Sequence, residues 1–153
     1  MGYDMYALGV PRANRNRDTD YFCLNIWGMG ETCEAMARLD MLSDVDRAPF
    51  PEPPSQDEWV EPEDAATGSE WATYHEGIRE VLASHPNQDD PRLPSFKLCS
   101  NDGWIVTAVE CRALVGLWRQ RERGVAPDRL PSWWAEWIDW LDRCGRRDGF
   151  EVL

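Results

Sequence analysis

The chain has 153 residues, the usual length of one domain, so we expect a single domain over residues 1–153. Its composition is 42% hydrophobic with nine tryptophans, which excludes a wholly disordered chain. The formal net charge of -12 repels phosphate backbones and anionic lipids, and no stretch approaches the roughly 20 apolar residues that cross a bilayer. We therefore expect no nucleic-acid partner and no membrane association.

The strands expected near the N-terminus cover residues 3–10 and 21–27. The second of them, "YFCLNIW", has apolar residues on both faces, which predicts a central position in a sheet. Gly28-Met29-Gly30 then predicts a turn, and a helix is expected over about residues 31–43.

An extended loop is predicted over about residues 48–68. This stretch, "APFPEPPSQDEWVEPEDAATG", combines five prolines with six carboxylates, so it cannot continue a helix or fill the centre of a sheet. Thr67 and Glu70 then have the spacing of a capping box and predict the start of an amphipathic helix that runs to about Ser84.

The stretch "CSNDGWIVTAVEC" (residues 99–111) predicts a hairpin followed by a helix. Lys97–Cys99 and Trp104–Val106 are short β-like runs on either side of the turn residues Asn101-Asp102-Gly103. Thr107 and Glu110 repeat the capping-box spacing, and a helix over about residues 108–123 follows.

A last helix, "WWAEWIDWLDRC", ends near Gly145, and "GFEVL" closes the chain as a strand. With this order of elements, the sequence predicts an α+β fold in which a small mixed or antiparallel sheet packs against about four helices.

The cysteines predict the redox environment. They lie at positions 23, 33, 99, 111 and 144, and an odd number without a C-x-x-C pair favours reduced thiols over a disulfide framework. The N-terminus has no apolar run of the signal-peptide kind. We expect a cytoplasmic protein whose thiols are reduced and mostly buried.

Two patterns that could hold a cofactor or a metal are incomplete. Gly28-Met29-Gly30 would need a third glycine where Cys33 stands. His75-Glu76 begins like a zinc-protease helix, but Arg79 occupies the position of the second histidine. We therefore expect no cofactor and no metal, and we assign no catalytic residue.

The blocks "LNIWGM", "CSNDGWIVTAVEC" and "GFEVL" resemble small tryptophan-containing proteins encoded by actinobacteria and their phages. In that family the second block reads roughly N-D-G-W, then V-T, then a Glu-Cys helix. The resemblance implies a bacterial or phage setting in the cytoplasm. It gives no catalytic role to Asn101, Asp102 or Glu110.

Our preferred hypothesis is a small acidic protein that binds a basic protein, as an immunity factor or a phage counter-defence antagonist would. The apolar arc of the last helix is broad, and Trp133 and Trp140 lie at its margin, where a half-exposed aromatic ring is suited to an interface. The acidic loop would attract a positive surface. The predicted contact residues are Glu58, Glu61, Glu63, Asp64, Trp133 and Trp140.

The alternative is a small enzyme or ligand-binding domain. Its pocket would combine polar side chains with two indole rings, and the predicted lining is Asn25, Trp27, Asn101, Asp102 and Trp104. A deep cavity between these side chains would favour this alternative over a protein-binding surface.

Overall fold

The computed structural model describes residues 2–153 and has the predicted α+β fold. Its main sheet contains four antiparallel strands in the order β2-β1-β6-β5, and a separate pair, β3 and β4, is parallel. The strands are β1 (Gly2–Ala7), β2 (Tyr21–Asn25), β3 (Leu42–Ser43), β4 (Leu93–Pro94), β5 (Trp104–Val106) and β6 (Phe150–Val152).

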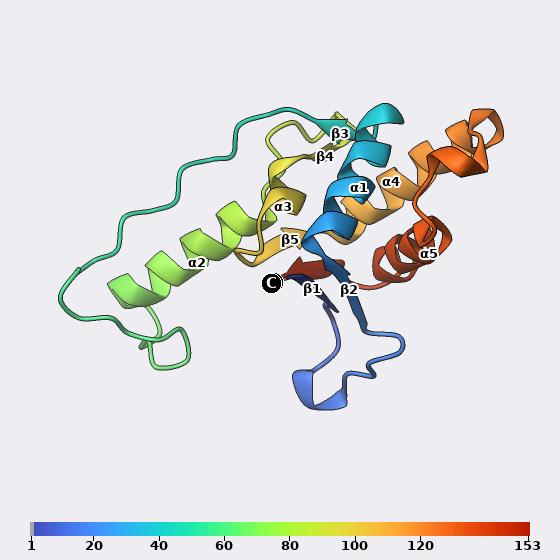
Figure 1. Ribbon diagram of the computed structural model, residues 1–153. Helices are drawn as coiled ribbons and strands as arrows, with labels where there is room; N and C mark the ends of the chain where they lie inside the picture. The colour runs from blue at the N-terminus through green and yellow to red at the C-terminus, as the bar shows by residue number, and fades with distance from the viewer. Residues whose placement is uncertain (1) are drawn as a thin grey trace.

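Five α-helices accompany the sheet, and α4 packs against α5. They are α1 (Ile26–Arg38), α2 (Glu70–Ala83), α3 (Phe96–Cys99), α4 (Ala108–Arg121) and α5 (Trp134–Gly145). Figure 1 shows α2 and α5 at opposite sides of the molecule, with the segment between β3 and α2 running as a wide arc around α2. Short 3-10 helices cover Arg12–Asn14, Glu122–Gly124 and Pro127–Arg129. No helix within residues 2–153 is both long and apolar enough to span a membrane.

One face of the main sheet contributes to the hydrophobic core. Side chains alternate between the two faces of a strand, so residues that pair across strands share a face. Met5 pairs with Val152 and Ala7 with Phe150, while Trp104 pairs with Val152 from the other side. All five side chains are buried, so this face is the one covered by helices.

The structure differs from the sequence prediction around β2 and α1. β2 is an edge strand and not a central one, because β1 is its only neighbour within residues 2–153. Asn25 caps α1, since its Oδ1 accepts a hydrogen bond from the Gly28 amide at 2.7 Å. Gly28 and Gly30 therefore lie inside the helix and form no turn. The helix ends at Arg38, before the residues predicted, and Asp40 follows with a φ of 52°.

A second difference concerns the predicted hairpin. Lys97–Cys99 belongs to α3, and β5 pairs with the C-terminal strand β6, so residues 101–103 do not join two paired strands. Gly149 precedes β6 with a φ of 88°, and a Cβ atom there would lie 2.1 Å from the Val106 carbonyl oxygen. The close approach of these two backbones therefore requires glycine.

The two predicted capping boxes have different outcomes. Thr107 caps α4 as predicted, because its Oγ1 accepts a hydrogen bond from Glu110 N and Glu110 Oε2 accepts one from Thr107 N at 2.8 Å. Thr67 caps nothing. Ser69 is the N-cap of α2 instead, with its Oγ accepting a hydrogen bond from Ala72 N at 3.1 Å.

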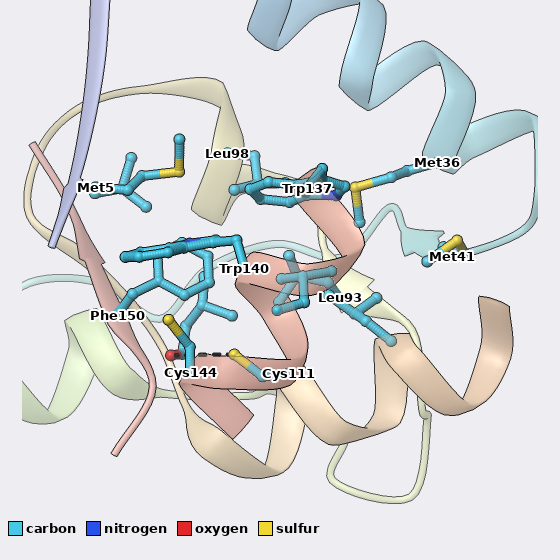
Figure 2. Close-up of a cluster of buried hydrophobic side chains, with 14 of the residues drawn as sticks. Met5, Met36, Met41, Leu93, Leu98, Cys111, Trp137, Trp140, Cys144 and Phe150 are labelled. Carbon is cyan, nitrogen blue, oxygen red and sulfur yellow. Dashed lines mark hydrogen bonds between the residues drawn. The ribbon is translucent and has the colours of Figure 1, made fainter. Parts of the chain in front are cut away.

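The largest buried side chains come from α5. Trp137 and Trp140 are fully buried, and the rings of Phe22 and Phe150 flank Trp140 at centroid distances of 5.9 and 5.7 Å. Figure 2 shows both indole rings projecting from α5 into the core. The prediction that Trp140 is half-exposed is therefore wrong, and a fully buried ring has no surface to offer a partner.

The cysteines are free, but the prediction that they are mostly buried is wrong. Cys111 and Cys144 are buried as their helical phase predicts, Cys33 is half-buried, and Cys23 and Cys99 are exposed. Cys23 is exposed because it pairs with Asp4 on the face of the sheet opposite the buried Met5 and Leu24.

Thiol labelling should separate these cysteines. Burial raises the pKa of Cys33 and Cys144 to about 12 and that of Cys111 well above its ordinary value, so little reactive thiolate forms at those three. We expect Cys23 and Cys99 to react in the native protein, Cys33 more slowly, and the buried pair only after unfolding. Peptide mass spectrometry after a short labelling pulse measures this, and early label on Cys111 would contradict it.

Asp20 joins the loop between β1 and β2 to the C-terminal segment. Its carboxylate accepts hydrogen bonds from Asn16 N at 2.8 Å and from Arg147, and these lower the pKa of Asp20 below its ordinary value. A depressed folded-state pKa stabilises the fold fully above about pH 4, and the stabilisation disappears as the pH falls through that pKa. In urea unfolding, Asp20→Asn should be less stable than wild type at neutral pH and closer to it in strong acid. An equal difference at both pH values would contradict this.

Candidate functional site

The most negatively charged part of the chain is the acidic loop (residues 48–68) together with the first part of α2. Residues 48–78 contain no lysine or arginine and eight carboxylates, namely Glu52, Asp57, Glu58, Glu61, Glu63, Asp64, Glu70 and Glu76. None of the eight forms an ion pair within the described part of the chain, residues 2–153. The loop contains no helix or strand.

Trp59 is the apolar centre of this region. Its side chain remains 59% exposed although its ring contacts three aromatic side chains of α2. The centroid distances are 5.3 Å to Trp71, 6.1 Å to Tyr74 and 5.5 Å to His75, all with edge-to-face geometry. The indole Nε1 donates a hydrogen bond to Glu61 Oε1 at 3.0 Å, which fixes the ring beside a carboxylate.

The acidic loop is attached to α2 at two further points. His75 Nε2 lies 2.7 Å from the Val60 carbonyl oxygen and donates to it. Pro51 passes over the middle of α2, where a Cβ atom on Gly77 would lie 3.2 Å from Pro51 Cγ. The loop is therefore held against the helix and does not depend on a partner for its position.

We call this region the acidic aromatic surface. It consists of Glu58, Trp59, Glu61, Glu63, Asp64, Trp71, Tyr74 and His75. Unpaired carboxylates produce a negative field that accelerates the approach of a positive surface. The exposed indole offers apolar area and a π face that attracts lysine or arginine side chains. This combination is suited to binding a cationic protein surface.

The structure separates the residues that the preferred hypothesis grouped together. Glu58, Glu61, Glu63 and Asp64 are exposed on the acidic loop. Trp133 immediately precedes α5, is half-buried, and donates its indole N–H to Thr32 Oγ1 at 2.9 Å. Because α5 and α2 lie at opposite sides of the molecule in Figure 1, Trp133 cannot share one small interface with the loop.

The five residues of the alternative pocket do not form one. Asn25 is used as the cap of α1, and Trp27 is 80% exposed on the surface of that helix. Trp104 is buried, with its Nε1 donating a hydrogen bond to Ser100 Oγ at 2.9 Å. Asn101 and Asp102 are exposed. None of these side chains lines the cavity beside α2 and α4 or either of two smaller cavities within residues 2–153.

A buried ion pair joins Lys97 to Glu110. Lys97 Nζ lies 2.8 Å from both carboxylate oxygens of Glu110 and also donates to the carbonyl oxygens of Ile105 at 2.8 Å and Ala83 at 3.2 Å. Burial lowers the pKa of Lys97, while the Glu110 charge opposes that shift. Because every ammonium proton has an acceptor, Lys97 is a structural cation that connects α2, β5 and α4.

The histidines also have structural contacts. His85 Nε2 lies 3.0 Å from the Arg92 carbonyl oxygen, and His75 contacts Val60 as described above. In residues 2–153, no group of three or more His, Cys, Asp or Glu side chains is placed to hold a metal ion.

Two important features were absent from the sequence prediction. Trp59 had a visible signal, since it is a large aromatic residue between Asp57, Glu58 and Glu61 in a loop rich in proline and carboxylates. The pairing of Lys97 with Glu110 had none, because it depends on how α3 and α4 meet in space.

No family model, curated protein or solved structure matches this chain.

Proposed function

We propose that the protein is a small interaction module whose acidic aromatic surface binds a basic protein. The observation that supports this most strongly is the exposed ring of Trp59, held among carboxylates that have no cationic partner within residues 2–153. A solubilising loop would need the charges but would not need an ordered, exposed indole beside them.

The two parts of the surface have different roles in this proposal. The carboxylates of Glu58, Glu61 and Glu63 accelerate encounter with the partner, and Trp59 slows dissociation by burying apolar area on contact. This division is typical of antagonists that must capture a basic target quickly and hold it. We propose that the protein acts in the bacterial cytoplasm as an immunity-type or phage counter-defence antagonist.

The test is a comparative capture experiment with three variants. Trp59→Ala removes the ring, and Glu58→Lys/Glu61→Lys/Glu63→Lys reverses the loop charge. The matched control is Glu31→Lys/Glu122→Lys/Glu136→Lys, which makes the same change in net charge at exposed positions outside the surface. Immobilised wild type and variants are incubated with bacterial lysate at low and high salt, and retained proteins are quantified by mass spectrometry.

We expect at least one protein of high isoelectric point to be retained by wild type and by the control, and to be lost from both surface variants. Truncating a central Trp of an interface typically costs about 2 kcal/mol of binding free energy or more, so Trp59→Ala should reduce retention clearly. A set of retained proteins that is the same for wild type and both surface variants would refute the proposal.

A further inference from the structure

We propose that the cavity between the C-terminal end of α2 and the N-terminal end of α4 binds a small organic cation, an amine carried on an apolar body. The cavity has a volume of about 750 Å³. Pockets for small ligands typically measure about 300–1,000 Å³. It is bounded by the end of α2, by residues 84–91 and by the first turns of α4. The inference does not rest on the proposed protein-binding function.

The cavity is preformed because a buried ion pair fixes two of its sides. Ala83, at the end of α2, and Glu110, in the first turn of α4, both line it. Lys97 donates to the Ala83 carbonyl oxygen at 3.2 Å and to the Glu110 carboxylate at 2.8 Å. These hydrogen bonds of Lys97 therefore fix the distance between the C-terminal end of α2 and the N-terminal end of α4 even when no ligand is bound.

The charge of the lining selects a cation. Within residues 2–153, four carboxylates line the cavity, those of Glu80, Asp89, Asp90 and Glu110, whereas no lysine or arginine does. Arg92 pairs with Asp90 at 2.9 Å and Lys97 with Glu110 at 2.8 Å, so those two charges are neutralised. Glu80 and Asp89 have no ion-pair partner within residues 2–153. They leave two uncompensated negative charges facing one cavity.

The dipole at the N-terminal end of α4 opposes the effect of these carboxylates on a cation. A helix N-terminus is equivalent to roughly half a positive charge and attracts anions. Because Glu80 and Asp89 contribute two full negative charges, the net field still favours a cation. An anionic ligand is the competing possibility, and the experiment below distinguishes it.

Half of the remaining lining residues are apolar, and they account for the body of the ligand, while Ser84, His85, Gln88 and Thr107 are polar. Ala83, Pro91, Val109 and Ala113 contribute aliphatic surface. Val109 is 67% exposed, although it is a β-branched apolar residue in the first turn of a helix. A ligand whose amine faces Glu80 and Asp89 while its apolar body covers Val109 would use both parts of the lining.

Three probes of similar size test the proposal, namely benzylamine, benzyl alcohol and benzoate, titrated into the full chain and followed by NMR shifts of the Ala83 and Ala113 methyl groups. We expect saturable shifts with benzylamine at both methyls and at least about tenfold weaker binding of benzyl alcohol, since two nearby carboxylates attract the ammonium group even in a high dielectric. No saturable shift with benzylamine would overturn the proposal. So would equal binding of benzyl alcohol or tighter binding of benzoate.

Variants locate the binding to this cavity. Glu80→Gln/Asp89→Asn should weaken the binding of benzylamine by about tenfold and leave the affinity for benzyl alcohol unchanged. The matched control, Glu61→Gln/Asp64→Asn, removes the same charge from the acidic loop and should leave both affinities unchanged. Equal effects of the two charge variants would mean non-specific attraction and would overturn the site. Because both pairs of side chains are exposed and form no ion pair within residues 2–153, both variants are expected to fold, which their melting temperatures verify.

Discussion

Replacing Lys97 with methionine is expected to lower the free energy of unfolding by about 3–5 kcal/mol, because it leaves a buried carboxylate without its counter-ion. Lys97 is fully buried, and its ammonium group makes hydrogen bonds to Glu110 and to the carbonyl oxygens of Ala83 and Ile105. Methionine keeps the length of the side chain and supplies none of these donors. Urea unfolding monitored by circular dichroism measures the loss.

A double variant separates the effect of the unpaired charge on stability from the effect of lost packing. Lys97→Met/Glu110→Gln removes both charges, and the amide oxygen of the new side chain can still accept the hydrogen bond from Thr107 N. We expect the double variant to be more stable than Lys97→Met alone, because the unpaired buried charge is gone. A loss below about 1 kcal/mol for Lys97→Met would show that the pair is not buried as described.

Replacing Trp140 with alanine is expected to cost about 3–5 kcal/mol of stability through loss of core packing. The ring is fully buried, lies between Phe22 and Phe150, and has Arg143 over its face at 5.8 Å. Trp59→Ala is the contrasting change, since that ring is largely exposed, and its cost should stay within about 1 kcal/mol. Thermal and urea unfolding of the two variants measure the difference.

The same pair of variants separates stability from binding. Below its melting temperature, Trp140→Ala should retain partner capture, whereas Trp59→Ala should lose it while remaining stable. Full stability of Trp140→Ala would contradict the burial of this ring.

Much of the fold could be predicted because local signals agreed with the final contacts. The capping box at Thr107, the apolar periodicity of α2, α4 and α5, and the prolines of the acidic loop each determine structure within a few residues. The predictions are wrong where contacts between residues far apart in the sequence determine the local structure. Lys97–Cys99 has a strand-like composition, but β5 finds its partner in β6 at the other end of the chain, which leaves the preceding segment to form α3.

The candidate site was predicted in part for the same reason. The charge of the acidic loop is a property of composition, and the structure exposes Glu58, Glu61, Glu63 and Asp64, whose contact with a partner stays a prediction. The burial of Trp140 could not be predicted, because it depends on which sides of α5 are covered by other elements. A helical projection assumes one buried side, whereas α5 is covered by α4 and also by aromatic residues of the sheet, so its margin is buried too.

The central claim is that the acidic aromatic surface captures a basic protein by long-range attraction. The most direct test measures the association rate constant for the captured partner as a function of ionic strength, with wild type, Glu58→Lys/Glu61→Lys/Glu63→Lys and the matched control Glu31→Lys/Glu122→Lys/Glu136→Lys. We predict that reversing the loop charge lowers the rate at low salt by about tenfold or more and flattens its salt dependence, while the control stays close to wild type. Association rates that are the same for wild type and the loop variant at every ionic strength would contradict the claim.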